Sequence, residues 1–308
     1  MSTFYAWVGS FAERGWLPSD FQYPFLIRGF LCVLILAPIL GGLSHLVVTR
    51  RMAFFSAALG QAALTGVAIG LLLGEPLNAP YGGMFGFCLL TTLAMVYVKR
   101  HATLPSDTLI GVFHALTLGL GLCLLVLLTR QFNVHQVESV LFGSLLTVTD
   151  TDLLLLLIVG AVVAVLLVRE YNTLLLDSLS PPLASVAGAR SAFLEYFFAV
   201  ILTLSIVVSL KVIGALLVEA LVLVPAASAR NVARGARQYF VLSVVVAFLA
   251  GAGGLGVSTK LLVPTGGAVV LAASAIFFVT LAIGRLTRAG GRVGDSRPSV
   301  RGGARGDG

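Results

Sequence analysis

The chain has 308 residues, of which 58% are hydrophobic and only 11% are charged, and its mean hydropathy is +1.02. A water-soluble domain carries roughly 45–50% apolar and about 25% charged residues, so this composition excludes a soluble enzyme, a disulfide-rich secreted domain and a disordered chain. Lipid must therefore be the solvent for much of the surface. Cys32, Cys88 and Cys123 lie inside apolar runs without a CxxC spacing, and we interpret them as small apolar residues.

The N-terminal segment, residues 1–25, is predicted to lie along the outer membrane interface. Phe4, Trp7, Val8 and Phe11 follow the i, i+3, i+4, i+7 spacing of an amphipathic helix, and both tryptophans of the chain fall in this segment. Tryptophan is enriched where a protein meets the lipid headgroups, which favours this placement.

Apolar runs of roughly the length that crosses a bilayer follow this segment. They are about 26–48, 53–74, 82–98, 108–129, 152–168, 193–209, 212–229, 238–257 and 266–285. The sixth and seventh runs meet at Lys211, where either a tight hairpin or one broken helix would fit. We therefore expect an all-α integral membrane protein, a bundle of about eight to nine transmembrane helices over residues 26–286.

Basic residues set the expected orientation, because cytoplasmic loops are enriched in Lys and Arg. With the N-terminus outside, nine of the 20 basic residues fall in inner loops and six at the C-terminal end. The net charge of +7 is thus a signal of topology rather than of a nucleic-acid surface. Residues 287–308 are rich in Arg and Gly, and we expect a disordered, basic, cytoplasmic tail.

Two connections are long enough to hold structure of their own. Residues 130–151 are partly apolar but too short for a full span, which favours a re-entrant or interfacial element. Residues 169–192 face the cytoplasm in this topology and contain a short apolar helical pattern, interrupted at Pro181 and Pro182. This second pattern is equally consistent with docking of another protein and with a plain linker.

Glu219 stands out among the polar residues of the spans, because it lies alone within the apolar run 212–229. Pro225 follows two turns later and is expected to kink the helix. An acidic group beside a broken helix is typical of an ion pathway. The alternative is a protonated Glu219 that is hydrogen-bonded to a neighbouring helix.

Three other polar residues lie within the spans. His114 is on a small, polar helix face, and either a pathway role or a hydrogen bond to a neighbouring carbonyl would explain it. Gln61 lies beside a stripe of Ala and Gly spaced by four residues, which predicts close helix packing; its amide could bind a cation or another helix. His45, near the inner end of the first run, is expected to extend to the interface.

The common catalytic motifs are missing from the sequence. It contains no GxxxxGK[ST], so it cannot bind ATP through a P-loop, and no HExxH. Ser144 has no obvious base in a neighbouring span. We therefore predict no catalytic residue, and an intramembrane enzyme is poorly supported.

Three segments carry a family resemblance: RRMAFFSAALGQAALTGVAIGLLLG (50–74), SVLFGSLLTVTDTDL (139–153) and SLKVIGALLVEALVLVPAASAR (209–230). Together, and in this order, they resemble the membrane permease subunits of bacterial ABC importers for zinc, manganese or iron. The similarity covers roughly residues 25–286. It implies a multi-pass protein of the bacterial plasma or inner membrane.

The resemblance also implies partners. A cytoplasmic ABC ATPase would use the ATP, and this chain would bind no cofactor. The assembly would also contain an extracytoplasmic metal-binding protein, a second permease copy and membrane lipid. No nucleic acid is expected as a partner. Leu174–Gly188 corresponds to the family's coupling helix, although Ser-Pro-Pro at 180–182 replaces the Asp-Pro-Glu of many members. The residues assigned to ATPase coupling are Leu174, Leu175, Asp177, Leu183, Ala184 and Gly188.

One departure from the family affects the expected metal path. Typical members carry an Asp and, four residues later, a His on the second span, where both can reach one cation. Here these positions are Ala57 and Gln61. We hypothesise that Glu219, with Gln61 and His114 nearby, forms a transit site for the metal instead. Oxygen ligands would favour manganese or iron(II) over zinc.

The leading interpretation is therefore the permease subunit of an ATP-driven importer of divalent transition metal ions. The alternative is a gradient-driven secondary transporter or an ion channel, in which Glu219 and His114 relay protons or ions. The sequence does not separate the three metals, nor import from export.

Overall fold

The computed structural model describes residues 24–76, 81–128, 149–261 and 263–293, and within these ranges the chain forms helices and no strand. The helices are α2 (Pro24–Thr49), α3 (Phe55–Leu72), α4 (Tyr81–His101), α5 (Ser106–Leu128), α7 (Asp150–Leu179), α8 (Pro181–Val186), α9 (Ser191–Ile213), α10 (Ala215–Val232), α11 (Ala236–Leu261) and α12 (Thr265–Val293). In this part of the chain, eight helices are long and apolar enough to cross a membrane. The predicted all-α membrane fold is confirmed.

The boundary between the sixth and seventh runs falls at Gly214 rather than at Lys211. α9 continues to Ile213, and α10 begins at Ala215. Gly214 has φ +81°, a backbone conformation that costs glycine little and other residues much more. α10 then packs mainly against α2, α11 and α12 rather than back along α9. The two runs therefore form two separate helices, and not a tight hairpin.

Pro225 lies inside α10, which continues on both sides of it. A proline in a helix removes one backbone hydrogen bond and disturbs the neighbouring turn. Here the amide of the next residue, Ala226, donates to Ser44 Oγ of α2 at 3.0 Å. A side chain of a neighbouring helix thus satisfies the backbone where the proline interrupts the usual pattern.

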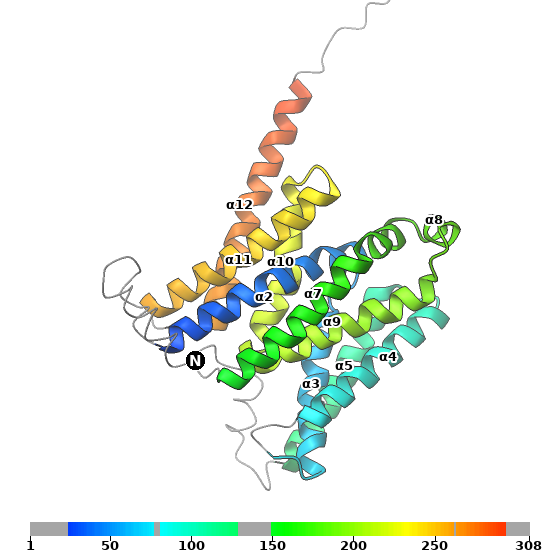
Figure 1. Cartoon of the computed structure of the whole chain (residues 1–308), viewed down its shortest axis with the longest axis vertical. Helices are drawn as coiled ribbons and strands as arrows, with labels where there is room; N and C mark the ends of the chain where they lie inside the picture. The colour runs from blue at the N-terminus through cyan, green and yellow to red at the C-terminus, as the bar shows by residue number, and fades with distance from the viewer. Residues whose placement is uncertain (1–23, 77–80, 129–148, 262, 294–308) are drawn as a thin grey trace, which may run out of the picture.

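The helices form two groups that meet along α7 and α9 (Figure 1). One group contains α3, α4 and α5, and the other contains α2, α10, α11 and α12. α2, α3 and α9 are largely buried, with 72–78% of each apolar window inside the protein, whereas 17% of the α12 window is buried. The peripheral helices expose leucine and valine side chains, as expected where lipid is the solvent.

α7 is much longer than the fifth apolar run. The run was predicted to end near residue 168, but the helix has 30 residues and ends at Leu179. Ser180 interrupts it, and Pro181 and Pro182 occupy the first turn of the short helix α8, where proline is well tolerated. The segment Leu174–Gly188, predicted as one coupling helix, is therefore divided between α7 and α8.

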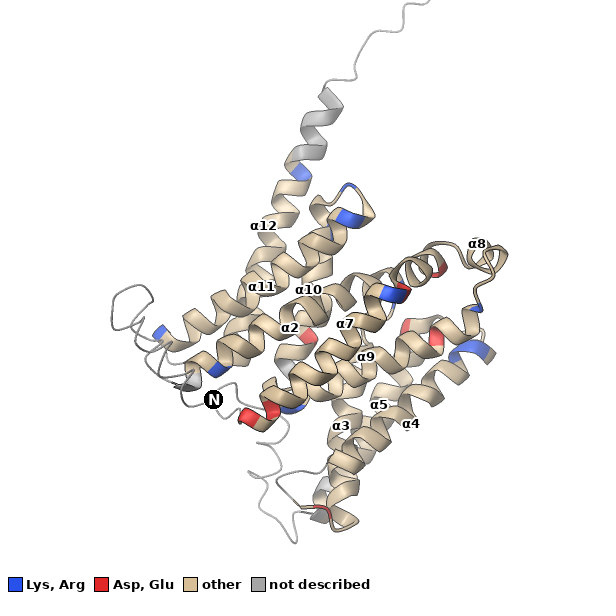
Figure 2. Cartoon of the chain, in the orientation of Figure 1, with Lys and Arg blue, Asp and Glu red and all other residues tan. Residues whose placement is uncertain are grey.

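Charged residues gather toward the ends of the helices (Figure 2). We call one end of the bundle the basic end; it contains the connections 49–55, 101–106, 179–191 and 232–236. At the opposite end, Lys211 Nζ lies 3.1 Å from Asp152 Oδ1 and also contacts the Tyr81 hydroxyl. That cluster links the starts of α4 and α7 to the end of α9.

Several predicted segments lie wholly or partly outside the described residues. They include most of the N-terminal segment 1–25 and nearly all of the connection 130–151. α12 continues as a helix to Val293, past residue 287, where the basic tail was predicted to begin. Residues 294–308 are outside the described part of the chain.

Small residues let α3 and α4 approach closely, as the stripe of Ala and Gly predicts. A Cβ atom placed on Gly66 would lie 2.6 Å from the Gly83 carbonyl oxygen and 2.8 Å from Met84 Cα. Because these are backbone atoms of α4, no side-chain movement could relieve the contact. Helices in a membrane gain from such approach because lipid gives them little hydrophobic reason to associate.

We expect Gly66→Ala to lower the thermal stability of the purified protein in detergent, because the added methyl group forces α3 and α4 apart. Overpacking of this kind costs about 1–3 kcal/mol. Gly86→Ala is the matched control, since a Cβ there meets no atom within 4 Å and alanine favours a helix over glycine by about 1 kcal/mol. Equal shifts in Tm for the two variants would contradict the tight contact.

Candidate functional site

Glu219 lies near the start of α10 and faces α3. Its side chain is half-buried, and Oε1 lies 3.4 Å from where a Cβ atom of residue 60 would be. The Glu219 carboxylate therefore lies against the backbone of α3 at Gly60. Gln61 is the next residue along α3 and is also half-buried. α10 and α3 thus bring Glu219 beside the backbone that carries Gln61.

His114 approaches the same place from α5. Its Nδ1 atom is buried and has no hydrogen-bond partner in the described part of the chain, and the ring is close enough to Glu219 for an electrostatic interaction. Thr65 Oγ1 of α3 donates to the Thr117 carbonyl oxygen at 2.8 Å, which fixes α5 against α3. The three hypothesised transit residues therefore come from three packed helices.

These groups do not form a complete site for a resident metal. Among the described residues, no group of three or more His, Cys, Asp and Glu side chains is placed to hold an ion. A closed zinc site has four such ligands, and a calcium or manganese site usually has more. Glu219 and His114 offer one carboxylate and one imidazole, which fits weak, transient contact with a cation.

Two residues of α3, Ala57 and Gln61, stand where typical family members carry Asp and His. The neighbouring helices cover this face of α3 only in part. Ala57 and Gln61 are half-buried, and Phe54, one turn before Ala57, is 58% exposed. The adjacent stripe of the same helix, with Ala58 and Ala62, is fully buried. The described helices of this chain therefore cover Ala57 and Gln61 only in part.

The residues assigned to ATPase coupling divide into two sets. Leu174, Asp177 and Ala184 are buried and fix the segment to the bundle, and Leu175 is half-buried. Leu183 is 60% exposed, and Gly188 is exposed with φ +82° in the turn after α8. The segment has two further exposed apolar residues, Leu179 and Val186, which are 67% and 87% exposed. They flank Leu183 in the sequence and were not among the predicted coupling residues.

A buried ion pair fixes the coupling segment to α2. Arg50 Nη2 lies 2.9 Å from Asp177 Oδ2 and donates to the Leu174 carbonyl oxygen at 3.1 Å, and both charged side chains are less than 10% exposed. The guanidinium also lies 4.9 Å from the centre of the Phe198 ring of α9. Burial lowers the pKa of Arg50 from its ordinary value, and the Asp177 carboxylate opposes that effect.

The sequence analysis placed Asp177 in the coupling segment but missed its partner. The two residues are 127 positions apart, so no local spacing connects them. The sequence held one indication of the pair: Asp177 is a single acidic residue in the apolar stretch after Asn172, and Arg50 and Arg51 form a basic turn after the first apolar run.

The prediction that His45 extends to the interface was wrong. The ring is fully buried; Nδ1 lies 2.8 Å from the Gly42 carbonyl oxygen and Nε2 lies 3.1 Å from the Tyr171 hydroxyl. Tyr239 and Phe240 of α11 pack edge-on against it. A backbone carbonyl and a tyrosine hydroxyl satisfy the two ring nitrogens inside the bundle, so the side chain has no need to reach water.

We expect Asp177→Asn to destabilise the protein strongly, because it leaves the Arg50 guanidinium buried without a counter-charge. Breaking a buried pair in this way costs about 3–5 kcal/mol, measurable as a lower Tm and a lower yield of monodisperse protein. Glu170→Gln is the control, since its partner Arg169 is 80% exposed and such surface pairs contribute about 0–1 kcal/mol. A similar, small effect of both variants would show that the Arg50–Asp177 pair contributes little.

Comparison with known proteins agrees with this architecture along most of the chain. The model of the ABC 3 transport family matches residues 22–284. The chain is 32% identical over 262 residues to the high-affinity zinc uptake system membrane protein ZnuB of Haemophilus influenzae, an alignment that covers 85% of this chain and 97% of ZnuB. The manganese import system permease protein ScaB of Streptococcus gordonii is 28% identical over 262 residues, covering 85% and 92% of the two chains.

The fold is also similar to a solved structure. A chain of PsaBC from Streptococcus pneumoniae in complex with Fab matches with a TM-score of 0.73 and 26% sequence identity, over 91% of this chain and 95% of that chain. The resemblance that three short segments indicated is thereby confirmed over nearly the whole length of both proteins. The chain belongs to the ABC 3 transport family.

Proposed function

We propose that the protein is the permease subunit of an ATP-driven importer of divalent transition metal ions, and that it forms the translocation path. The match to the family over residues 22–284 carries this proposal. The relatives include a zinc uptake protein and a manganese import permease, which supports a transition metal as the substrate class. The protein is a transport component rather than an enzyme, and it lacks the P-loop that ATP hydrolysis would need.

Three partners would complete the importer. A cytoplasmic ABC ATPase would dock on the exposed apolar residues of the coupling segment, Leu179, Leu183 and Val186, because such surfaces mark contact sites. An extracytoplasmic metal-binding protein would deliver the ion at the opposite end of the bundle. A second permease copy would complete the path, and the open face of α3 at Ala57 and Gln61 is available for it.

Within this path, we assign the cation contacts to Glu219, Gln61 and His114. The support is their convergence from α10, α3 and α5, together with the unpartnered Nδ1 of His114. A carboxylate, an amide oxygen and one imidazole favour manganese or iron(II) over a thiolate-preferring ion. Two copies of the chain would double this set of donors without forming a site so strong that it retains the ion.

The alternative is a gradient-driven transporter or channel in which Glu219 and His114 relay ions. The same two side chains would serve that mechanism. The comparisons give it no support, since the family and its relatives are components of ABC transport systems.

We expect Glu219→Gln to reduce uptake of radioactive manganese at least tenfold in cells that lack the native copy and grow in metal-poor medium. The amide keeps the shape of the side chain but removes the negative charge that attracts the cation. Glu170→Gln removes a carboxylate from α7 and should leave uptake unchanged. Co-purification of the ATPase with each variant shows that the complex is assembled. Unchanged uptake in Glu219→Gln would remove this residue from the path.

We also propose that the basic end faces the cytoplasm, in a bacterial inner membrane, with the C-terminus on the same side. In a variant without native cysteines, Leu73→Cys at the opposite end should react with a membrane-impermeant maleimide in spheroplasts, since residue 73 is 77% exposed. Ser185→Cys on the exposed surface of α8 should react only after the membrane is opened. The reverse pattern of labelling would overturn this orientation.

A further inference from the structure

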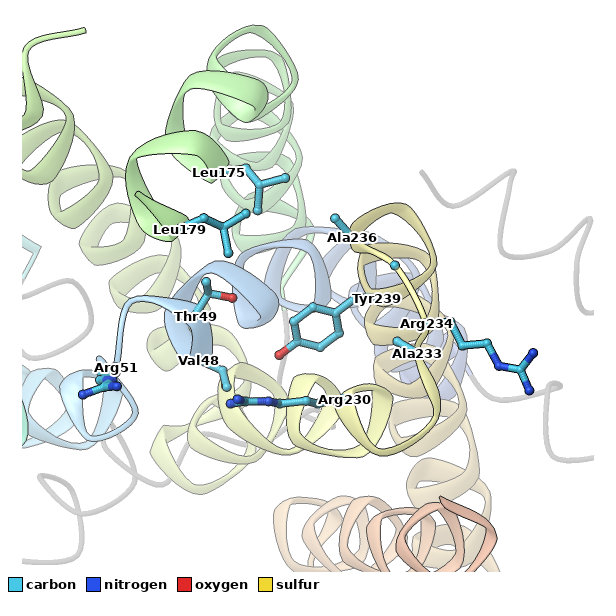
Figure 3. A pocket seen from close by; sticks show the side chains of 11 residues that line it. Val48, Thr49, Arg51, Leu175, Leu179, Arg230, Ala233, Arg234, Ala236 and Tyr239 are labelled. Atoms are coloured by element: carbon cyan, nitrogen blue, oxygen red, sulfur yellow. The ribbon is translucent and has the colours of Figure 1, made fainter. Parts of the chain in front are cut away.

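A cavity of about 530 Å³ opens at the basic end between the end of α7 and the turn from α10 to α11 (Figure 3). Arg51, Arg230 and Arg234 line it, and no acidic residue does. Leu175 and Leu179 of α7 cover another part of its wall. Figure 3 shows that the Arg234 side chain points away from Tyr239, whereas Arg230 lies beside it. The cavity therefore combines basic side chains with an apolar surface, and no acidic residue is among those that line it.

A buried polar atom in this cavity also lacks a partner. The Tyr239 hydroxyl is buried and makes no hydrogen bond within the described part of the chain. In Figure 3 it points toward the Arg230 side chain, and the two groups are close enough to interact electrostatically. A hydroxyl and a guanidinium side by side can both donate to the same acceptor. An anionic oxygen is the group that would satisfy both.

A second cavity, of about 660 Å³, lies next to the first between α2, α7 and α11. The two share Leu175 and Ala236 in their walls. The second is lined mostly by apolar side chains, with Arg237 as its one charged lining residue, and it reaches Pro38 of α2. At the rise of an α-helix, Pro38 is about 16 Å from Thr49 in the first cavity. The second cavity, or groove, thus extends from Leu175 and Ala236, which it shares with the first, far into the part of the bundle that spans the membrane.

One aromatic cluster contributes side chains to the linings of both cavities. His45, fully buried, is hydrogen-bonded to Tyr171 of α7 and packs against Tyr239 and Phe240 of α11. Tyr239 lines the first cavity, whereas Tyr171 and Phe240 line the second. The aromatic cluster that satisfies His45 therefore also sets the shape of both spaces.

We propose that these two cavities together bind one anionic phospholipid. The phosphate would contact Arg51, Arg230 and the Tyr239 hydroxyl, with Arg234 at the rim, and an acyl chain would occupy the groove beside Ala164 and Val168. Basic pockets between transmembrane helices are suited to such headgroups. The observation that favours a lipid over an acidic segment of a partner protein is the depth of the groove, because a soluble partner at the basic end could not fill it down to Pro38.

Binding of the headgroup is tested with the purified full-length chain, delipidated in detergent. The chain is titrated with phosphatidylglycerol or phosphatidylcholine, and native mass spectrometry counts the bound lipid. We expect one phosphatidylglycerol per chain, and a half-saturating concentration that rises about fivefold in Arg230→Gln and further in the double variant Arg51→Gln/Arg230→Gln. Arg285→Gln, an exposed arginine of α12 outside the cavity, should leave binding unchanged.

The groove half is tested by filling it without changing any charge. Ala164→Trp should abolish binding of phosphatidylglycerol, whereas Ala161→Trp, also exposed on α7 but outside the groove, should not. Unchanged binding in Ala164→Trp, with displacement of the lipid by millimolar inorganic phosphate, would identify a site for free phosphate and overturn the proposal. Loss of the ATPase from the double arginine variant, with phosphatidylglycerol binding intact, would overturn it in favour of a protein contact.

Discussion

Helices surrounded by lipid gain little from the hydrophobic effect when they meet one another, so this bundle depends on backbones that approach closely through small side chains. The contact of Gly66 with Gly83 fixes α3 against α4, and α3 in turn carries Gln61. The backbone of the same helix at Gly60 lies against the Glu219 carboxylate. The close packing of α3 thus also sets where Gln61 lies relative to Glu219.

The three side chains proposed as cation contacts are distributed one per helix. Glu219, His114 and Gln61 come from α10, α5 and α3, and among the described residues no group of three or more His, Cys, Asp and Glu side chains is placed to hold an ion. A cation meeting such a set exchanges only part of its hydration shell for protein atoms. Strong, closed coordination would instead retain the ion. If Glu219, His114 and Gln61 contact the metal as proposed, such a set favours passage of the ion over its storage.

The sequence alone was sufficient for the class of fold, because long apolar runs can be satisfied in lipid only as helices. It did not place the break at Gly214, since a charged residue, Lys211, is a more visible interruption than a glycine. It also ended the fifth span too early: the polar residues after Val168 continue one helix to Leu179. Contacts between distant segments, such as Arg50 with Asp177, leave no periodic signal, and the surroundings of His45 depend on three different helices.

The uninterrupted length of α7 has a mechanical consequence. At 1.5 Å per residue, its 30 residues form a rod of about 45 Å. One end is held by Asp152 to Lys211, and the other by Asp177 to Arg50. A tilt of about 5° pivoting at one end displaces the other by about 4 Å over this length. Because α7 is one continuous helix between these two ion pairs, it connects the two mouths of the bundle directly.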